Sequence, residues 1–417
     1  MTKPSARWTR RENKKSATAL THSQNSRPGR LTERPDWENG GFGLYIHWPF
    51  CAAKCPYCDF NSHVADTIDH TRWKSAYLNE LRRSAEETQG RILRSVFFGG
   101  GTPSLMDPDT VAEVLSEVHR LWPVANDLEV TLEANPTSVE AGRFRAFRDG
   151  GVSRISMGIQ SLKDDDLRQL GRLHSVDEAK KAFEIARTAF ERVSFDLIYA
   201  RQNQSLRDWE AELTEALEMA IDHLSLYQLT IEPGTAFGAR HAKGGLKGLP
   251  ADSLAADMFD LTQDVCARYG MPAYEVSNHA RDGAESRHNL VYWRYGDYIG
   301  IGPGAHGRIT DSRARFATET PLAPGKWLEQ VEQTGSGESM REALSLEDQA
   351  TEYLLMSLRL NEGTDLARLR SLGYSPDDDT LIQLQQEGLI DIAGRHLSTT
   401  SNGRLLLNAV LRQLLEA

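Results

Sequence analysis

Three cysteines lie within eight residues of this chain, Cys51, Cys55 and Cys58, at the spacing CxxxCxxC. Thiolates gathered in one loop at this spacing can hold a small inorganic cluster. A [4Fe–4S] cluster usually takes four cysteine ligands, so a set of three leaves one iron for another ligand. We therefore interpret the loop as an iron–sulfur site in which a small molecule completes the coordination.

Two other uses of these cysteines fit less well. A disulfide framework is disfavoured because the chain has four cysteines in 417 residues and shows no apolar signal segment. Zinc accepts three cysteines and a histidine such as His63, but structural zinc ligands usually come as two separated pairs. The fourth cysteine, Cys266, stands alone in a helical pattern, and we interpret it as a small buried apolar residue.

The charge of the chain is unevenly distributed. The net charge is −11, but residues 1–35 carry nine Lys or Arg and two Glu, so this segment has a charge of +7 and the remainder −18. An acidic body argues against a broad nucleic-acid surface. No stretch approaches the ~20 apolar residues that span a membrane. We therefore expect neither a nucleic-acid partner nor a membrane span, while the few cysteines and the lack of an apolar signal segment indicate a cytoplasmic protein.

The N-terminal segment 1–40 is polar and basic, and we predict a disordered tail there. Its richness in Arg, Ser and Thr and its few acids also resemble a mitochondrial transit peptide, although no clear amphipathic stripe runs through it.

After residue 43, apolar runs of strand length alternate with stretches of helical period. The predicted strands are 44–48, 95–98, 128–132, 154–157, 193–199 and 223–229. The predicted helices are 71–87, 109–121, 138–147, 176–190, 206–219 and 252–269. This alternation indicates parallel βα units, and six units are fewer than the eight of a closed barrel. We predict an α/β fold with a partial (β/α)6 barrel over residues 41–310, open at the carboxyl ends of its strands.

Residues 343–417 are predicted to form a small α+β domain that resembles a winged helix. Its expected elements are helices at 346–360 and 380–387, two short strands about Gly394, and a closing helix at 401–415. The wing has few cations, so we favour a structural or partner-docking role over DNA binding. Residues 311–342 are expected to be a linker with a connecting helix.

Polar residues follow the predicted strands where a barrel mouth would lie. A glycine run, Gly99 to Gly101, follows the second strand and lets the backbone approach a ligand. Glu133 follows the third strand, Gln160 the fourth, and Asp196 lies in the fifth. A buried polar group needs a partner, and several at one edge of a sheet indicate a ring of ligand contacts. Arg172 either reaches the same mouth or is a solvated arginine at a helix start.

The cysteine loop followed by Gly-Gly-Gly-Thr-Pro resembles the radical S-adenosylmethionine (SAM) superfamily. From about residue 43 to the C-terminus, the chain resembles the group that contains the coproporphyrinogen dehydrogenase HemN and the heme chaperone HemW, including a HemN-type C-terminal domain. The resemblance implies that Cys51, Cys55 and Cys58 hold a [4Fe–4S] cluster whose remaining iron binds SAM. The SAM contacts that it implies are Tyr45, Tyr57, Gly100, Gly101, Thr102, Glu133, Gln160, Arg172 and Asp196.

Two features distinguish the branches of this group. The dehydrogenase branch carries a further cysteine two residues after the third cluster ligand, where this chain has Phe60, as the chaperone branch does. The string HNxxYW resembles a heme-associated motif of the chaperone branch, and it implies heme contacts at His288, Asn289, Tyr292 and Trp293. On the sequence alone, a core histidine packed among aromatic rings is the better explanation of this string, and the resemblance reverses that preference.

A glycine-dense stretch at 298–307 contains His306, a second candidate for heme or substrate. A dinucleotide-binding loop there lacks the required βαβ context, so we expect a loop that closes beside the barrel mouth.

The resemblance implies a heme chaperone that binds heme, a [4Fe–4S] cluster and SAM. Its expected partners are apo-hemoproteins that receive the heme, such as those of the respiratory chain, and an electron donor. The alternative is an enzyme that decarboxylates the propionates of coproporphyrinogen III without oxygen through a deoxyadenosyl radical. A third interpretation is a radical SAM enzyme with an unrelated substrate. We assign no catalytic residue.

Overall fold

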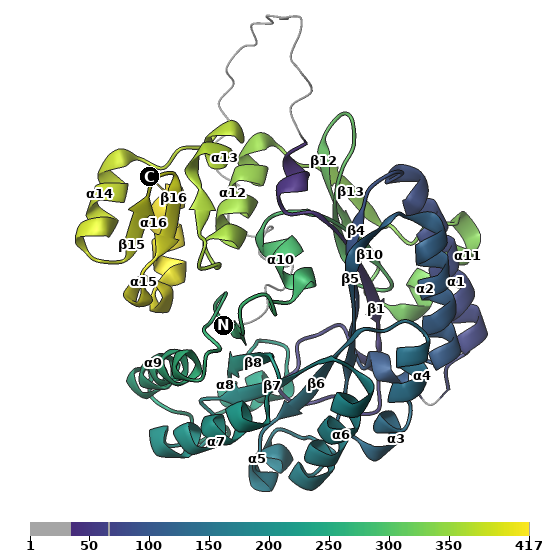
Figure 1. Ribbon diagram of the computed structural model, residues 1–417, viewed down its shortest axis with the longest axis horizontal. Coiled ribbons are helices and arrows are strands. Elements are labelled where there is room, and N and C mark those ends of the chain that lie inside the picture. The colour runs from purple at the N-terminus through teal and green to yellow at the C-terminus, as the bar shows by residue number, and fades with distance from the viewer. Residues whose placement is uncertain (1–34, 66, 417) are drawn as a thin grey trace, which may run out of the picture.

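The computed structural model describes residues 35–65 and 67–416. Most of the predicted basic tail, and with it the segment that resembles a transit peptide, lies outside the described residues. The largest element is one sheet of eleven strands, with the order β13-β12-β11-β10-β1-β4-β5-β6-β7-β8-β9. Figure 1 shows this sheet curving with helices on its outer side.

Six neighbouring strands of this sheet run parallel and form the predicted partial barrel. They are β1 (Phe42–Trp48), β4 (Leu93–Gly100), β5 (Val124–Ala134), β6 (Arg154–Gln160), β7 (Arg192–Tyr199) and β8 (His223–Gln228). The helices of these units are α1 (His70–Glu87), α2 (Pro108–Leu121), α3 (Ser138–Ala141), α4 (Phe144–Asp149), α5 (Asp164–Gln169), α6 (Val176–Ala189), α7 (Leu206–Met219) and α9 (Asp252–Arg268). The α/β class and the partial barrel predicted from the sequence are confirmed. The predicted single helix at 138–147 is two short helices, which residues 142 and 143 separate.

Local sequence signals explain where several helices begin. The Asp107 carboxylate accepts a hydrogen bond from the backbone N–H of Asp109, and Pro108 follows as the first residue of α2. Ser175 and Glu178 form a capping box at the start of α6, and Ser205 and Asp208 do the same at α7. These caps satisfy amide groups that have no partner inside the helix.

The alternation of side chains along the strands separates the core from the barrel interior. Apolar residues such as Val96, Leu132 and Phe195 are fully or almost fully buried in the main hydrophobic core. The alternate positions carry polar side chains, such as the buried Thr131 and Ser194. Because successive side chains of a strand point to opposite faces, the apolar residues face the helices and the polar residues face the concave side.

The chain after β8 extends both edges of the barrel sheet. Helix α8 (Ala236–Ala242) comes before α9, and β9 (Asn278–Ala280) pairs antiparallel with β8. The remaining elements are α10 (Arg287–Trp293), β10 (Asp297–Ile301), β11 (His306–Thr310), β12 (Arg315–Glu319), α11 (Pro324–Thr334) and β13 (Met340–Ala343). Strand β10 pairs parallel with β1, and β11 to β13 continue antiparallel. The segment expected as a linker with a connecting helix therefore contains α11 and also two strands of the main sheet.

The C-terminal part forms a small α+β module. Its elements are α12 (Leu346–Ser357), β14 (Thr364–Asp365), α13 (Leu366–Ser371), α14 (Asp378–Gln386), β15 (Ile390–Ala393), β16 (His396–Thr399), α15 (Ser401–Leu405) and α16 (Leu407–Glu416). The three strands form a separate antiparallel sheet. A helix, a strand, two helices and a hairpin in this order give the winged-helix-like arrangement predicted from the sequence.

The C-terminal module is packed on the barrel. Its core includes Phe259 and Tyr295 from the barrel side. The carboxylate of Glu352 in α12 pairs with the guanidinium of Arg308 in β11 at 2.7 Å, and it accepts a hydrogen bond from the Tyr295 hydroxyl at 2.8 Å. In the described part of the chain, no helix combines the length and apolar character that crossing a bilayer requires.

We expect Glu352→Ala to lower the free energy of unfolding by about 3–5 kcal/mol, because it leaves the Arg308 guanidinium buried without its carboxylate. Urea unfolding followed by circular dichroism measures this loss. The matched control is Glu362→Ala, which removes the exposed pair with Arg294 and should cost less than about 1 kcal/mol. Equal losses in the two variants would show that the buried pair does not hold the module on the barrel.

Candidate functional site

The three cysteines of the loop lie at the carboxyl end of β1. Cys51 ends the short strand β2 (Phe50–Cys51), which pairs with β3 (His63–Val64), and Cys55 and Cys58 follow in the loop. All three are free thiols of intermediate burial. Burial, together with the nearby thiols of Cys55 and Cys51, raises the pKa of Cys58 to about 11. The fold thus brings the three sulfur atoms close enough to influence one another.

The glycine-rich loop after β4 lies directly against the segment that leads into the cysteines. The N–H of Gly101 donates to the carbonyl of Trp48 at 2.7 Å, and the N–H of Thr102 donates to the carbonyl of Phe50 at 2.8 Å. A Cβ atom at Gly101 would lie 2.6 Å from the Phe50 carbonyl oxygen. The close approach of the two backbones therefore requires glycine at this position.

A chain of polar contacts connects two of the cysteines. The Thr102 hydroxyl lies 3.4 Å from the Sγ of Cys51, and the Asn135 amide donates to this hydroxyl at 3.1 Å. Asn135 Oδ1 accepts from Arg172 Nη2 at 2.6 Å, and Arg172 Nη1 lies 3.4 Å from the Sγ of Cys55. Arg172 is therefore not a solvated arginine but a half-buried member of the site.

Asn135 is not among the site residues predicted from the sequence. The signal was present, because Asn135 belongs to the polar stretch Glu133 to Pro136 that follows the third strand of the barrel.

Other predicted SAM contacts lie at the same end of the strands. Glu133 Oε2 accepts from the N–H of Gly100 at 3.2 Å. Tyr45 lies in β1, and its hydroxyl is 3.0 Å from His47 Nδ1. Asp196 is half-buried in β7, beside the end of β6. These residues, with Arg172, place charged groups of both signs around one mouth.

Gln160 marks this mouth in two ways. Its backbone has φ of 73°, a left-handed conformation that is uncommon for a residue other than glycine. Its side-chain Oε1 is buried, and no described residue is its hydrogen-bond partner. A buried polar atom without a partner costs free energy, so a bound ligand would relieve this cost. The thiols, the glycine loop and this carbonyl together fit a cluster with a polar ligand beside it.

His63, the histidine of the alternative zinc site, contacts another side chain, since its Nε2 lies 3.1 Å from Asn61 Oδ1. Cys266 is fully buried, as predicted.

The HNxxYW string forms the short helix α10, which packs on the concave face of the barrel. The His288 ring is stacked on Phe97 at 4.6 Å between centroids, and its Nδ1 lies 3.2 Å from the Ser95 hydroxyl. The ring also lies 6.0 Å from that of Tyr45, which connects the predicted heme residues to the predicted SAM residues. The His288 side chain is thus buried rather than exposed to the mouth.

The other members of the string point in different directions. Asn289 donates to the Tyr274 hydroxyl at 3.3 Å, and Tyr292 packs against Tyr298 at 4.2 Å. Trp293 lies under the guanidinium of Arg359, which the C-terminal module contributes. The string therefore connects the barrel interior with the C-terminal module.

His306 begins β11, on a hairpin that lies beside the cysteine loop. Burial lowers its pKa to about 4. The hairpin turn contacts the cysteine segment, because Asn61 Nδ2 donates to the carbonyl of Pro303 at 2.9 Å. His306 is thus on the cysteine side of the barrel and not on α10.

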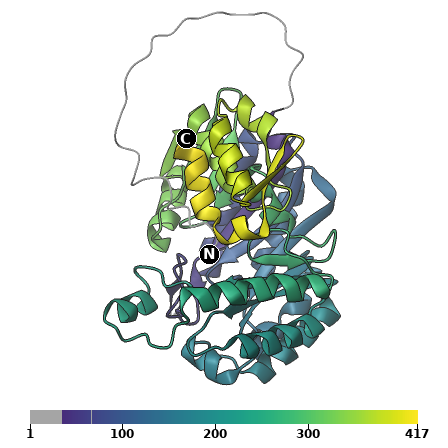
Figure 2. The same ribbon diagram turned by 90° about the vertical axis from the view of Figure 1, so that its left-hand side faces the viewer.

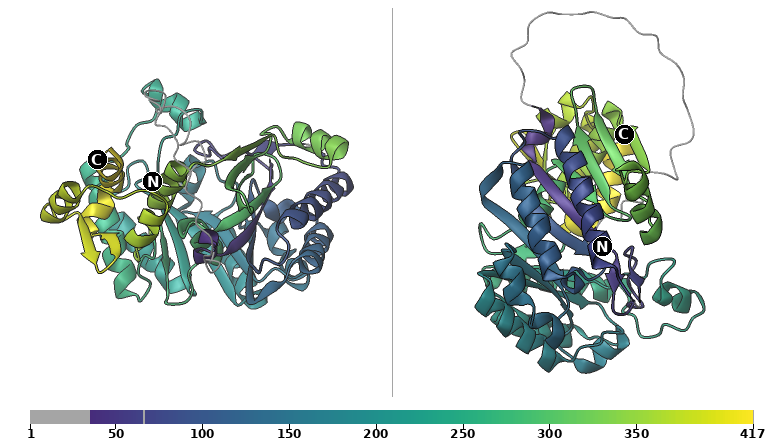
Figure 3. Two further views of the ribbon diagram at one scale, coloured as in Figure 1. Left: turned by 90° about the horizontal axis from the view of Figure 1, so that it is seen from above. Right: turned by 90° about the vertical axis from the view of Figure 1, so that its right-hand side faces the viewer.

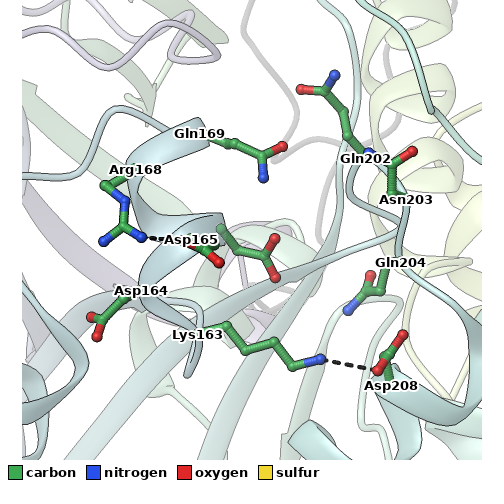
Figure 4. Close-up of a pocket in the computed structure, with 10 residues that line it drawn as sticks. Lys163, Asp164, Asp165, Arg168, Gln169, Gln202, Asn203, Gln204 and Asp208 are labelled. Atoms are coloured by element: carbon green, nitrogen blue, oxygen red, sulfur yellow. Dashed lines mark hydrogen bonds and ion pairs between the residues drawn. The ribbon is translucent and has the colours of Figure 1, made fainter.

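A polar pocket of about 560 Å³ lies between the segments that follow β6 and β7. Figure 4 shows the residues that line it. Lys163 pairs with Asp208 between the two segments, and Arg168 pairs with Asp165 within α5. None of the residues predicted to contact the cluster, SAM or heme lines this pocket, so it lies outside the site built around the cysteines.

Comparison with known proteins agrees with this geometry. A profile of the radical SAM superfamily matches residues 45–216, and a profile of the HemN C-terminal domain matches residues 344–406. The heme chaperone HemW of Escherichia coli is 37% identical over 385 residues, which cover 89% of this chain and 97% of that protein.

The chain belongs to the radical SAM superfamily. Membership of this superfamily implies a [4Fe–4S] cluster and SAM as cofactors. Another radical SAM relative, the mitochondrial radical S-adenosyl methionine domain-containing protein 1 of Bos taurus, is 38% identical over 387 residues, with 89% of this chain and 87% of that protein covered. The solved structure of HemN from E. coli, a radical SAM enzyme, matches with a TM-score of 0.76 over 92% of this chain and 93% of that one, at 21% identity, and it confirms the fold.

Gly171 offers a test of how tightly the cysteine loop is packed in this radical SAM protein. It has φ of 69°, and a Cβ atom there would lie 2.6 Å from Pro56 Cδ, inside the loop. Gly90 has a similar φ of 73° but nothing within 4 Å of an added Cβ. We expect both alanine variants to lose about 1–2 kcal/mol of unfolding free energy from the left-handed backbone.

Gly171→Ala should lose about 1–3 kcal/mol more unfolding free energy than Gly90→Ala, because the added Cβ overpacks and displaces the cysteine loop. It should also retain less iron and sulfide per chain after reconstitution. Urea unfolding and iron and sulfide analysis measure both effects, and identical behaviour of the two variants would show that the contact with Pro56 does not constrain the loop.

Proposed function

We propose that Cys51, Cys55 and Cys58 hold the [4Fe–4S] cluster and that SAM binds in the mouth beside it. The proximity of the three thiols and the contact of the glycine loop with them support this placement. The SAM contacts that we propose are Tyr45, Tyr57, Gly100, Gly101, Thr102, Glu133, Gln160, Arg172 and Asp196.

Charge complementarity assigns roles within this set. The Arg172 guanidinium suits the SAM carboxylate, and the carboxylates of Glu133 and Asp196 suit the amino group and the ribose hydroxyls. The buried Gln160 Oε1 would gain a donor from the same ligand. When bound, the cluster and SAM supply radical chemistry, while these residues orient the ligand and exclude water.

We further propose that the protein is a heme chaperone that transfers heme to apo-hemoproteins. The observation that carries this proposal is similarity over 89% of the chain to proteins named as heme chaperones, at 37% identity to that of E. coli and 36% to that of Mycobacterium tuberculosis over 90% of the chain. Phe60 supports it as well, since it occupies the position where the dehydrogenase branch carries a cysteine. The Phe60 side chain is 42% exposed beside the cysteine loop.

The cellular location of this function stays a prediction. The cysteine content suggests a cytoplasmic protein, but relatives named as mitochondrial are as similar to this chain as the bacterial HemW proteins are.

An anaerobic assay of the reconstituted protein, with SAM and a reductant, tests the chaperone proposal. We expect stoichiometric heme binding and no conversion of coproporphyrinogen III offered in parallel. Conversion to protoporphyrinogen IX with release of 5′-deoxyadenosine would overturn the proposal in favour of the dehydrogenase.

Cys55→Ala should lose the iron–sulfur absorbance band because the cluster needs its thiolate, whereas Cys266→Ala, which alters the cysteine outside the loop, should retain it.

The heme ligand requires a separate test, because the structure buries His288. If His288 is the axial ligand, α10 must move to admit heme, and His288→Ala should weaken heme binding about tenfold or more and shift the heme absorbance band. Phe97→Leu is the control, because it disturbs the same aromatic stack without removing a ligand. A His288 variant with unchanged heme affinity and spectrum would assign the imidazole to the core and leave the ligand elsewhere.

A further inference from the structure

Three segments meet where the C-terminal module packs on the barrel, namely residues 273–280, helix α10 and the turn after α12. The Asn361 N–H, in that turn, donates to the carbonyl of Tyr274 at 3.1 Å, and the Asn361 amide donates to the carbonyl of Ala273. From α10, Asn289 donates to the Tyr274 hydroxyl at 3.3 Å. Figure 2 and the left panel of Figure 3 show the module, in yellow, beside the teal and green segments of the barrel.

Two arginines of the module reach this junction without an acid in contact with them. Arg359 follows α12, and its guanidinium lies over the Trp293 ring, 5.5 Å from the centroid. Arg404, in α15, is 8% exposed. Among residues 35–65 and 67–416, none forms a hydrogen bond or an ion pair with either guanidinium. A buried charge without such a partner is costly, so this pair of arginines calls for an anion.

Glu275 is a buried acid near both arginines, but its own segment occupies it. Its Oε1 accepts from the Ser277 N–H at 3.1 Å and also from the Asn278 amide. Burial raises the pKa of Glu275, and the two hydrogen bonds and then the charges of Arg359 and Arg404 oppose that shift. The carboxylate therefore acts on the arginines from a distance and does not complete their hydrogen bonding.

The junction keeps an excess of positive charge. Two guanidinium groups face the single carboxylate of Glu275, which leaves one positive charge in excess. The fully buried His279 is the other titratable group near Arg404. Burial, together with the charge of Arg404, lowers the pKa of His279 to about 3. Its ring is therefore neutral at physiological pH and neither adds to the excess nor offsets it.

The indole of Trp293 supplies a neutral donor at the same junction. Trp293 is 7% exposed, and its buried Nε1 has no hydrogen-bond partner among the described residues. A buried indole N–H usually finds an acceptor. Trp293 and Asn289 are four residues apart in α10, so their side chains lie on the same face of the helix, toward Tyr274. The donor thus lies beside Arg359, and an acceptor is missing for both.

We propose that Arg359, Arg404 and the Nε1 of Trp293 form a binding site for a carboxylate, the junction site. A guanidinium pairs with a carboxylate through two parallel hydrogen bonds, and one negative charge matches the excess of one positive charge. Arg359 is half-buried and so connects the site with solvent. The carboxylate belongs either to a propionate of heme or to a free small acid. Only the heme source rests on the proposed function, in which Trp293 belongs to the heme-associated string.

The test compares Arg404→Met with Arg412→Met in the full chain. Each variant removes one positive charge from the module and keeps an unbranched stem, but Arg412 is exposed on α16. A second variant, Trp293→Phe, removes the Nε1 donor and keeps a ring. The probes are heme, heme dimethyl ester with both propionates esterified, and sodium propionate. Absorbance titration measures the affinity for the two hemes, and thermal unfolding measures propionate binding against sodium chloride of equal ionic strength.

If the carboxylate is a heme propionate, we expect Arg404→Met to weaken heme binding about tenfold or more, because a hydrogen bond to a charged group is lost. Trp293→Phe should weaken it about fivefold, the value of one ordinary hydrogen bond. Arg412→Met should stay within about twofold of the unaltered protein. The dimethyl ester should bind equally to the Arg404 and Arg412 variants.

If the carboxylate is a free acid, propionate should raise the Tm of the unaltered protein and of Arg412→Met more than chloride does. It should not do so for Arg404→Met, and heme should bind alike to all three. In both cases Arg404→Met should keep its free energy of unfolding, measured in urea, because replacing a buried charged group by an apolar one of similar volume is often neutral.

The inference would be overturned if the Arg404 and Arg412 variants matched in heme affinity and in their response to propionate relative to chloride. A large loss of unfolding free energy in Arg404→Met, with unchanged ligand affinities, would likewise assign Arg404 to the packing of the module. If the unaltered protein bound no heme, the proposed chaperone function would fail, and the propionate measurement would still decide on the junction site.

Discussion

The geometry of the site depends on one tight contact between two backbone segments. One is the glycine-rich loop after β4, and the other is the segment between β1 and the cysteines. Two hydrogen bonds of 2.7 and 2.8 Å join them, and a side chain at Gly101 would meet the Phe50 carbonyl. This contact fixes the distance between the cysteines and the rest of the barrel mouth. The polar chain through Thr102, Asn135 and Arg172 depends on it, because Thr102 starts that chain and belongs to the same loop.

The partial barrel separates two kinds of packing. Apolar side chains between the strands and the outer helices stabilise the fold, while the concave face keeps polar groups such as Thr131 and Ser194. A polar interior costs stability unless its groups are satisfied, and here short hydroxyl side chains largely satisfy one another and Arg154. Helix α10 lies between the barrel and the C-terminal module. His288, at one end of the HNxxYW string, contacts Ser95 and Phe97 of the barrel, and Trp293, at the other end, contacts Arg359 of the module.

Much of this architecture could be predicted from the sequence. Long apolar runs gave all six barrel strands within a few residues, and the spacing of the cysteines indicated the cluster loop. The site residues could be placed at one mouth because parallel strands end at the same edge. Short elements were missed. Helix α10 has seven residues, and its place inside the barrel depends on packing against β1 and β4, which no local signal records. Strands β12 and β13 lie in a stretch without a clear hydrophobic period. Asn135 belongs to the site because it contacts Arg172, which lies far from it in the sequence.

The order of strands in the sheet has a consequence for how the cofactor site matures. β1 carries the chain into the cysteines, yet one of its neighbours in the sheet, β10, ends at residue 301. Asn61, just after the third cysteine, is held by the carbonyls of Pro303 and Leu322. During synthesis the first sixty residues emerge long before these partners, and pairing between distant segments is slow. We therefore expect the three thiols to stay in an incompletely folded loop until the last third of the chain is made. With the cluster at these thiols, as we propose, its insertion would come late in biogenesis, and a reducing environment would keep the thiols available until then.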